Sequence, residues 1–179
     1  MTGAAPGLLT VGHGQASAAE LAELLTGAGV DLVVDIRRFP GSRRYPHLAR
    51  DVLAHDLPAV GVEYRWEERL GGRRSLPRDV PSPDTWWTVA AFRAYAAHTR
   101  TPEFRAALRE VLCDARRRRV AVMCSESLWW RCHRRLVADV AALEHGVDVR
   151  HLLPDGSLRP HQPAAGARLD EHGSVVWDG

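Results

Sequence analysis

The sequence contains no lysine: all 24 basic residues are arginine, and the formal net charge at pH 7 is only +2. Without lysine there is no side-chain amine for a Schiff base, so such an adduct would have to use the N-terminal amine. Arginine guanidiniums bind phosphates and carboxylates through paired hydrogen bonds. The composition therefore excludes catalysis by a lysine Schiff base and suits a polyanionic partner.

Cysteine is scarce, and long hydrophobic runs are missing. The three cysteines are Cys113, Cys124 and Cys132, and an odd number in a chain of this size favours free thiols in a reducing compartment. No apolar run approaches the length of a membrane span. Residues 1–9 have neither the basic start nor the long apolar centre of a signal peptide. We therefore expect a cytoplasmic protein with no membrane partner.

The remaining pattern predicts one α/β domain over residues 1–179, because 179 residues with 45% hydrophobic content can bury one substantial core. Apolar runs predict strands at residues 8–11, 32–36, 62–66, 120–123 and 147–152. Helical periodicity predicts helices at residues 17–28, 47–57, 84–98, 102–118 and 129–145, the first opened by a capping box at Ser17. This alternation is typical of a Rossmann-like fold, with a mostly parallel sheet of about five strands flanked by helices. Residues 71–83 are expected to form a long surface loop, and residues 154–179 an irregular tail with a short hairpin ending at Trp177.

Polar side chains gather where the predicted strands end. His13 follows the first strand, Asp35 ends the second, and Cys124 and Glu126 follow the fourth. The carboxyl ends of parallel strands meet at one edge of a sheet, where open α/β sheets bind their ligands. We therefore expect the active site at this edge.

Two carboxylates flanked by a histidine suit glycosidic cleavage, in which one carboxylate orients water or stabilises a sugar cation and an acid assists the leaving group. Glu126, Asp35, His13 and His133 are the candidates. The alternative is structural: Asp35 pairs with Arg37 or Arg134, and Glu126 caps the helix that starts near Trp129. We expect Glu126→Gln and Asp35→Asn to abolish activity and leave the fold intact.

Arginines and aromatic rings point to a substrate that contains a phosphate and a base. Arginines beside Pro40 and Gly41 are typical of a phosphate-binding loop, although a solvated charge run is the alternative. Consecutive tryptophans on a helix cannot both be fully buried, so one of each pair is available for base stacking. The candidate substrate-binding residues are Arg37, Arg43, Ser42, Gly71, Gly72, Trp129, Trp130, Arg131 and Arg134.

Cys124 supports a different chemistry, since a thiolate at the end of a strand can act as a nucleophile. The spacing disfavours a phosphatase loop, because six residues separate Cys124 from Arg131 and that loop requires five. The alternative is a small buried hydrophobic side chain.

Zinc ligands could be drawn from Cys124, Cys132, His133 and His13, but the spacing lacks a C-x-x-C pair. We expect no metal and no cofactor.

Five separated motifs carry a family resemblance. They are Val11-Gly-His-Gly14, Asp35-Ile-Arg-Arg-Phe-Pro-Gly-Ser-Arg43, Leu70-Gly-Gly72, Cys124-Ser-Glu126 and Cys132-His-Arg-Arg135. Over about residues 8–161 the chain resembles domain-of-unknown-function family 488, in which a serine usually stands in place of Gly14. The resemblance implies a compact α/β domain and says little about the reaction.

Three functional hypotheses follow. The first is a hydrolase that cleaves the N-glycosidic bond of a modified or damaged base, like a DNA glycosylase in base-excision repair, with DNA favoured over RNA as the partner. The second is a cysteine-dependent enzyme that acts on a small anionic or sulfur-bearing substrate. The third is a non-catalytic domain that binds nucleic acid or nucleotides. The sequence leaves the oligomeric state open.

Overall fold

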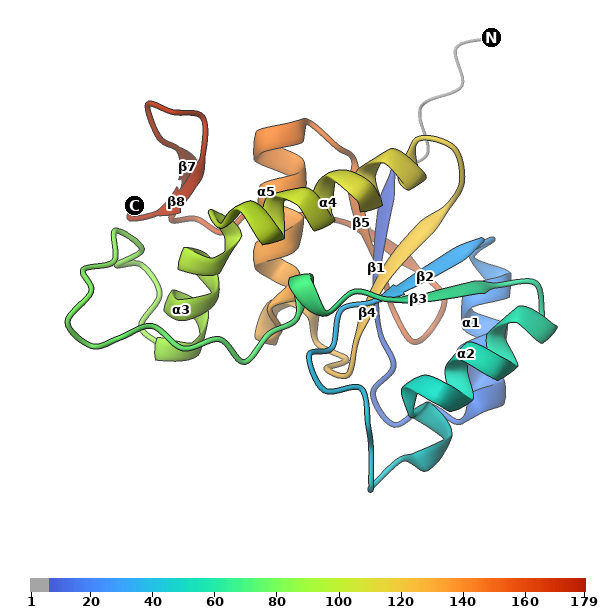
Figure 1. Ribbon diagram of the computed structural model, residues 1–179. Helices are drawn as coiled ribbons and strands as arrows, with labels where there is room; N and C mark the ends of the chain where they lie inside the picture. Colours follow the sequence, from blue (N-terminus) through green and yellow to red (C-terminus); the bar gives the residue numbers. More distant parts are fainter. Residues whose placement is uncertain (1–6) are drawn as a thin grey trace, which may run out of the picture.

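A central sheet of six strands organises the molecule. The computed structural model describes residues 7–179, so the N-terminal amine lies outside the described residues. The strands are β1 (Leu8–Gly12), β2 (Leu32–Asp35), β3 (Glu63–Trp66), β4 (Val120–Cys124), β5 (Val149–Leu152) and β6 (Leu158–Pro160). Their order is β3-β2-β4-β1-β5-β6, and β1 to β5 are parallel (Figure 1). The predicted α/β domain with a mostly parallel sheet is confirmed.

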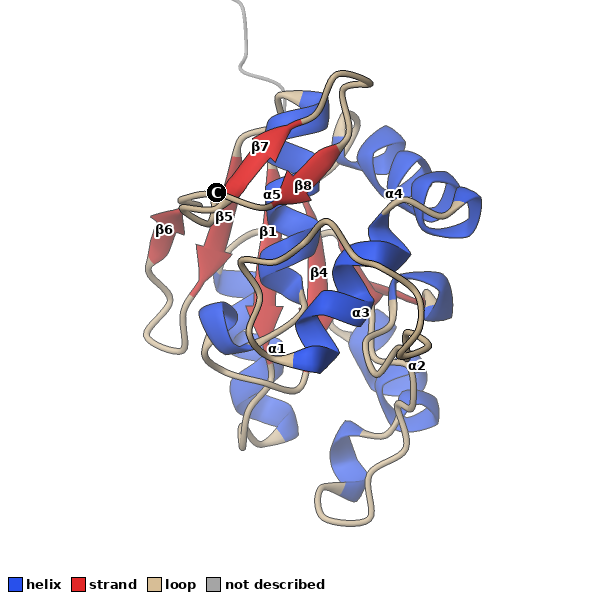
Figure 2. Ribbon diagram, turned by 90° about the vertical axis from the view of Figure 1, so that its left-hand side faces the viewer, coloured by secondary structure: helices blue, strands red, loops and turns tan. Residues whose placement is uncertain are grey.

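Two layers of helices cover the sheet. The helices are α1 (Ala18–Gly27), α2 (Arg50–Ala59), α3 (Ala90–Thr99), α4 (Pro102–Ala115) and α5 (Arg134–His145), with short 3₁₀ turns η1 (Pro46–Leu48), η2 (Glu68–Leu70) and η3 (Trp129–Arg131). Successive residues of a strand point to opposite faces. Val34 and Val122 pack in one core with α3, α4 and α5, while Val33 and Met123 pack in a second core with α1 and α2. The sheet therefore lies between these layers (Figure 2).

The sixth strand was not expected. β6 pairs antiparallel with β5 through a turn at Pro154-Asp155-Gly156, where Gly156 has φ +82°. Asp and Gly are typical turn residues, and glycine adopts a positive φ at little cost. The tail predicted to be irregular thus begins with an edge strand. Its predicted terminal hairpin is present as β7 (Ala167–Leu169) and β8 (Val175–Trp177).

Two predicted helices begin at least five residues later than expected. α3 starts at Ala90 instead of Asp84, because the buried Asp84 carboxylate accepts hydrogen bonds from Arg100 and from the backbone N–H of Trp177. α5 starts at Arg134 instead of Trp129, because Cys132 has extended backbone angles that separate η3 from the helix. The capping box at Ser17 is confirmed. Within residues 7–179, no helix combines the length and apolar character that crossing a membrane requires.

Candidate functional site

A cavity of about 620 Å³ lies at the carboxyl ends of β1, β2 and β4. It is the site that the predicted topology indicates, since ligands bind where parallel strands end. The predicted site residues that line it are His13, Arg37, Ser42, Gly72, Cys124, Glu126, Arg131 and His133. Those outside its lining are Asp35, Arg43, Gly71, Trp129, Trp130 and Arg134. The sequence groups the carboxylates of Asp35 and Glu126 together, but only Glu126 lines the cavity.

Asp35 is a fully buried ion-pair partner. Its side chain has 0% exposure, and its two carboxylate oxygens accept from Nε and Nη2 of Arg37 at 2.9 and 2.6 Å. The Tyr64 hydroxyl also donates to Asp35, and burial together with the Asp35 charge raises the pKa of Tyr64 far above its usual value. Asp35 therefore fixes the guanidinium of Arg37 in the cavity wall.

His13 contacts the other side of that guanidinium. Its Nδ1–H donates to the carbonyl of Gly14 at 3.0 Å, so Nε2 is left to accept from Nη1 of Arg37 at 3.2 Å. Burial, followed by the Arg37 charge, lowers the pKa of His13. A neutral His13 thus helps Asp35 to orient Arg37.

The Cys124-Ser125-Glu126 loop crosses directly over the end of β1. A Cβ atom on Gly12 would lie only 1.9 Å from the carbonyl oxygen of Glu126, so this approach requires glycine. The buried guanidinium of Arg134 donates hydrogen bonds to the carbonyls of Glu126 and Ser127 and thereby fixes the position of the loop. The exposed Glu126 side chain accepts from the Leu128 N–H at 3.1 Å. This bond leaves a carboxylate oxygen available in the cavity wall.

Two free thiols and an imidazole form a cluster in the same wall. The Sγ atoms of Cys124 and Cys132 lie 2.6 Å apart, and Cys132 Sγ lies 3.6 Å from Nδ1 of His133. Burial raises the pKa of both thiols. At Cys132 this effect is outweighed by the hydrogen bond from Cys124 and by the neighbouring His133 and Arg134, which together hold its pKa well below the usual value. For Cys124, burial and its contact with Cys132 raise the pKa. Ionisation of the two thiols is therefore coupled, because a hydrogen bond from one cysteine stabilises the thiolate of the other.

Cations and an exposed ring surround the cavity mouth. The lining includes Arg37, Arg38, Arg73 and Arg131. Phe39, 61% exposed, also lines the cavity, and the guanidiniums of Arg38 and Arg73 lie 5.5 and 6.0 Å from its ring centroid. Phe39 and Arg73 are not among the site residues that the sequence predicts. The only feature of the sequence that pointed to Arg73 is the predicted long loop over residues 71–83.

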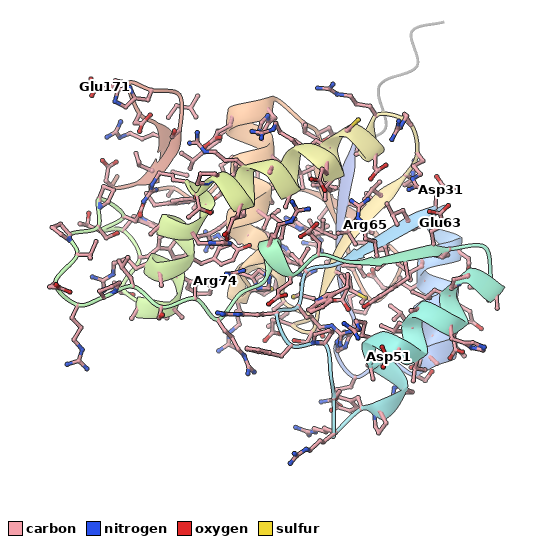
Figure 3. The ribbon with its side chains drawn as sticks, viewed as in Figure 1. Asp31, Asp51, Glu63, Arg65, Arg74 and Glu171 are labelled. Carbon is pink, nitrogen blue, oxygen red and sulfur yellow. The ribbon has the colours of Figure 1, made fainter. Side chains whose placement is uncertain are left out.

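The glycine pair before Arg73 allows that loop to pack closely. A Cβ on Gly71 would lie 2.8 Å from the Arg38 backbone, and a Cβ on Gly72 would lie 2.9 Å from Nδ1 of His133. The Arg74 guanidinium donates to the carbonyls of Gly71 and Glu68 and holds the loop in place (Figure 3). Ser42 has a comparable local role, because its hydroxyl accepts from the N–H of Tyr45.

The tryptophans lie outside this cavity. Trp129 stacks on His151 with a centroid distance of 4.0 Å, whereas Trp130 is 48% exposed. Of the other pair, Trp87 is buried in the core and Trp86 packs against it. One tryptophan of the Trp129-Trp130 pair is thus exposed, as predicted, but neither ring lines the cavity.

His151 belongs to a buried hydrogen-bonded chain. The Thr10 hydroxyl donates to Nδ1 of His151, Nε2–H of His151 donates to Nδ1 of His161, and Nε2–H of His161 donates to Asp139, at 2.7, 3.0 and 2.7 Å. The Asp139 carboxylate can only accept, which sets these directions for neutral imidazoles. Burial, then the neighbouring His161 and Arg134, lower the pKa of His151 to about 3. The chain supports Trp129 and thereby the segment that leads to Cys132.

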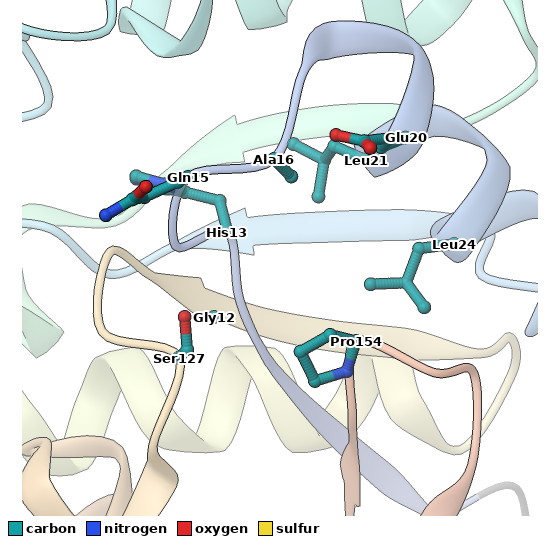
Figure 4. A pocket seen from close by; sticks show the side chains of 9 residues that line it. All are labelled: Gly12, His13, Gln15, Ala16, Glu20, Leu21, Leu24, Ser127 and Pro154. Atoms are coloured by element: carbon teal, nitrogen blue, oxygen red, sulfur yellow. The ribbon is translucent and has the colours of Figure 1, made fainter.

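A smaller cavity of about 330 Å³ lies beside α1 (Figure 4). Leu21, Leu24 and Pro154 contribute apolar atoms, and Gln15 and Glu20 contribute polar ones. His13 lines both cavities. The larger cavity is lined by Cys124, Cys132, Glu126 and four arginines, so it is the candidate functional site.

The chain matches the family described as "Domain of unknown function DUF488" over residues 17–141. This match covers more than half of the 179 residues, so the chain belongs to this family, and the resemblance seen in the motifs is confirmed. Asp35, Glu126 and the thiol cluster lie within the matched region, whereas His13 precedes it. Neither the curated proteins nor the solved structures gave a match.

Proposed function

We propose that this protein hydrolyses the N-glycosidic bond of a modified or damaged base in nucleic acid, with DNA favoured over RNA. The observation that carries the proposal is the position of Glu126. Glu126 is exposed and belongs to the lining of a cavity that also includes four arginines. A carboxylate of this kind can orient water and stabilise the positive charge that develops on the sugar.

The arginines supply the phosphate contacts. Guanidiniums bind phosphate oxygens through paired hydrogen bonds, and Arg38, Arg73 and Arg131 line the cavity. Arg37 is oriented by Asp35 on one side and by His13 on the other. In this proposal Asp35 and His13 are positioning residues, and Glu126 is the catalytic carboxylate.

Phe39 supplies the stacking surface. Its ring is largely exposed and lines the cavity, and aromatic rings stack on unpaired bases without requiring a particular sequence. A base rotated out of the stack would lie between Phe39 and the strand ends. The oxygen of a water molecule then bonds to the sugar carbon as the carbon–nitrogen bond breaks. Glu126 accepts the proton released by the water, and the departing base takes up a proton from solvent.

The test is incubation of the purified protein with labelled duplexes that each carry one modified or damaged base, followed by mild alkali. Alkali breaks the strand wherever a base has been lost. The proposal expects strand breaks with at least one duplex. A folded protein that binds these duplexes and releases no base from any of them would contradict it.

The thiol cluster favours a second candidate, a cysteine-dependent enzyme acting on a small anionic or sulfur-bearing substrate. The lowered pKa of Cys132 supports a thiolate in the cavity wall. This alternative expects stoichiometric alkylation of Cys124, the nucleophile suggested by the sequence, or of Cys132 to abolish turnover. Alkylation without loss of activity would exclude it.

A further inference from the structure

Contrary to the expectation of no metal from the sequence spacing, we propose that Cys124, Cys132 and His133 form a zinc site whose fourth position opens to the cavity. Their donor atoms all lie within 4.8 Å of one another, and all three residues line the cavity. Two thiolates and an imidazole are donors that zinc prefers, and three protein ligands with an open position are typical of catalytic rather than structural zinc sites.

The imidazole of His133 is already oriented as a ligand. Its Nε2 lies 3.0 Å from the carbonyl oxygen of Ile36, and a carbonyl only accepts, so Nε2 carries the proton. Nδ1 is therefore the atom that faces Cys132 Sγ, and it gives up any proton it carries when it binds a metal. Metal-binding histidines are commonly fixed in this way, through a hydrogen bond from the second nitrogen to a backbone carbonyl.

The distances allow a tetrahedral ion. With Zn–S of about 2.3 Å and Zn–N of about 2.0 Å, a tetrahedral site places sulfur and nitrogen about 3.6 Å apart and two sulfurs about 3.8 Å apart. The distance from Cys132 Sγ to His133 Nδ1 is 3.6 Å. The Cys124–Cys132 distance of 2.6 Å would have to increase by about 1.2 Å when the ion binds.

The surroundings support a buried ion. Tyr95 packs edge-on against His133 with a centroid distance of 5.0 Å, and Gly72 leaves room for Nδ1. The backbone N–H of Arg134 donates to Cys132 Sγ at 3.4 Å. Two thiolates neutralise the charge of Zn²⁺, so the bound site adds no net charge to the buried region. This inference does not depend on the glycosidic reaction, because metal binding is measured without any substrate.

The experiment uses the full chain without an affinity tag, purified under reductant, stripped with a chelator and titrated with Zn²⁺ alone. Native mass spectrometry counts the ions, and Co²⁺ in place of Zn²⁺ reports thiolate ligands through their charge-transfer absorption. We expect one zinc per chain and a sulfur-to-cobalt absorption. Cys132→Ser and His133→Gln should each weaken zinc binding by about 10-fold or more. Cys113→Ser, which removes the exposed third thiol, is the matched control and should bind normally.

Several results would overturn the site. One is the absence of stoichiometric zinc in the reduced wild-type protein, and another is zinc binding that survives Cys132→Ser or is lost in Cys113→Ser. A Cys124–Cys132 disulfide that persists under reductant would also overturn it. If a cysteine variant fails to fold, His133→Gln and the wild-type cobalt spectrum decide the question. Glycosidic activity is assayed separately, so the two proposals can fail independently.

Discussion

Arg37 binds both carboxylate oxygens of Asp35, and this ion pair is enclosed between the sheet and the cavity wall. This ion pair distinguishes Asp35 from Glu126, although the two acids look equivalent in the sequence. Asp35 is buried and fully engaged, whereas Glu126 is exposed in the cavity. The first is suited to position a cation, and the second is free to act on a substrate.

Asp35→Asn is therefore expected to destabilise the fold, contrary to the expectation from sequence alone. Removing the charge leaves a buried guanidinium without its partner, which costs on the order of 3 kcal/mol. Urea denaturation measures the free energy of unfolding. Glu126→Gln is the control, and a change at this exposed position should stay within about 0.5 kcal/mol. Equal stabilities for the two variants would contradict the assigned roles.

Stability should fall as the pH falls from about 6.5 toward 3, because His151 has its pKa lowered to about 3 in the fold from an ordinary value of 6.5. In this window the unfolded chain binds a proton that the folded one does not, so His151 contributes a slope of up to about 1.4 kcal/mol per pH unit. The charged or titratable groups around it are His161, Asp139 and Arg134.

Urea denaturation at several pH values above 4.5 measures this slope where few carboxylates titrate. His151→Gln should reduce the slope, and substitution of the exposed His55 should not. An unchanged slope in His151→Gln would show that the buried histidine chain is not the source.

Phe39→Ala should weaken binding of single-stranded oligonucleotides and leave stability unchanged. Loss of one stacked base costs about 1 to 3 kcal/mol, or roughly 5- to 150-fold in affinity. Fluorescence anisotropy provides the measurement. Trp130→Ala removes an exposed ring outside the cavity and serves as the control. Weaker binding in Trp130→Ala alone would favour the tryptophan-stacking hypothesis from the sequence.

Gly12→Ala should lower stability by about 1 to 3 kcal/mol, since its Cβ would collide with the Glu126 carbonyl. The loop must then shift, so we also expect reduced activity. Thermal unfolding measures the first effect. Gly27→Ala is the matched control, because a Cβ there meets nothing within 4 Å and should be neutral or stabilising. Identical melting of both variants would argue against the close approach.

Most of the sheet could be predicted because its signals are local. Buried β-branched runs predict β1, β2 and β4 directly, and the parallel topology then brings His13, Arg37 and Glu126 to one edge. The late start of α3 could not be predicted. It depends on Asp84 contacting Arg100 and Trp177, which are distant in the sequence.

The roles of individual side chains also could not be predicted from the sequence. Whether Asp35 faces the cavity depends on Tyr64, 29 residues away, and on the side-chain conformation of Arg37. The exposed Phe39 carried no periodic signal, whereas the tryptophan pairs were conspicuous and lie elsewhere. Composition and spacing predicted the sheet edge at which the cavity lies, but side-chain packing decides which residues line that cavity.

The most direct test of the central claim compares base release by the wild-type protein and by Glu126→Gln, on the duplex that the wild type cleaves. We expect Glu126→Gln to lower the rate by about 10²- to 10⁴-fold and to retain the duplex affinity and the free energy of unfolding. Glu171→Gln, at an exposed position far along the chain, should behave like the wild type. Full activity in Glu126→Gln would contradict the assignment of this carboxylate as the catalytic group.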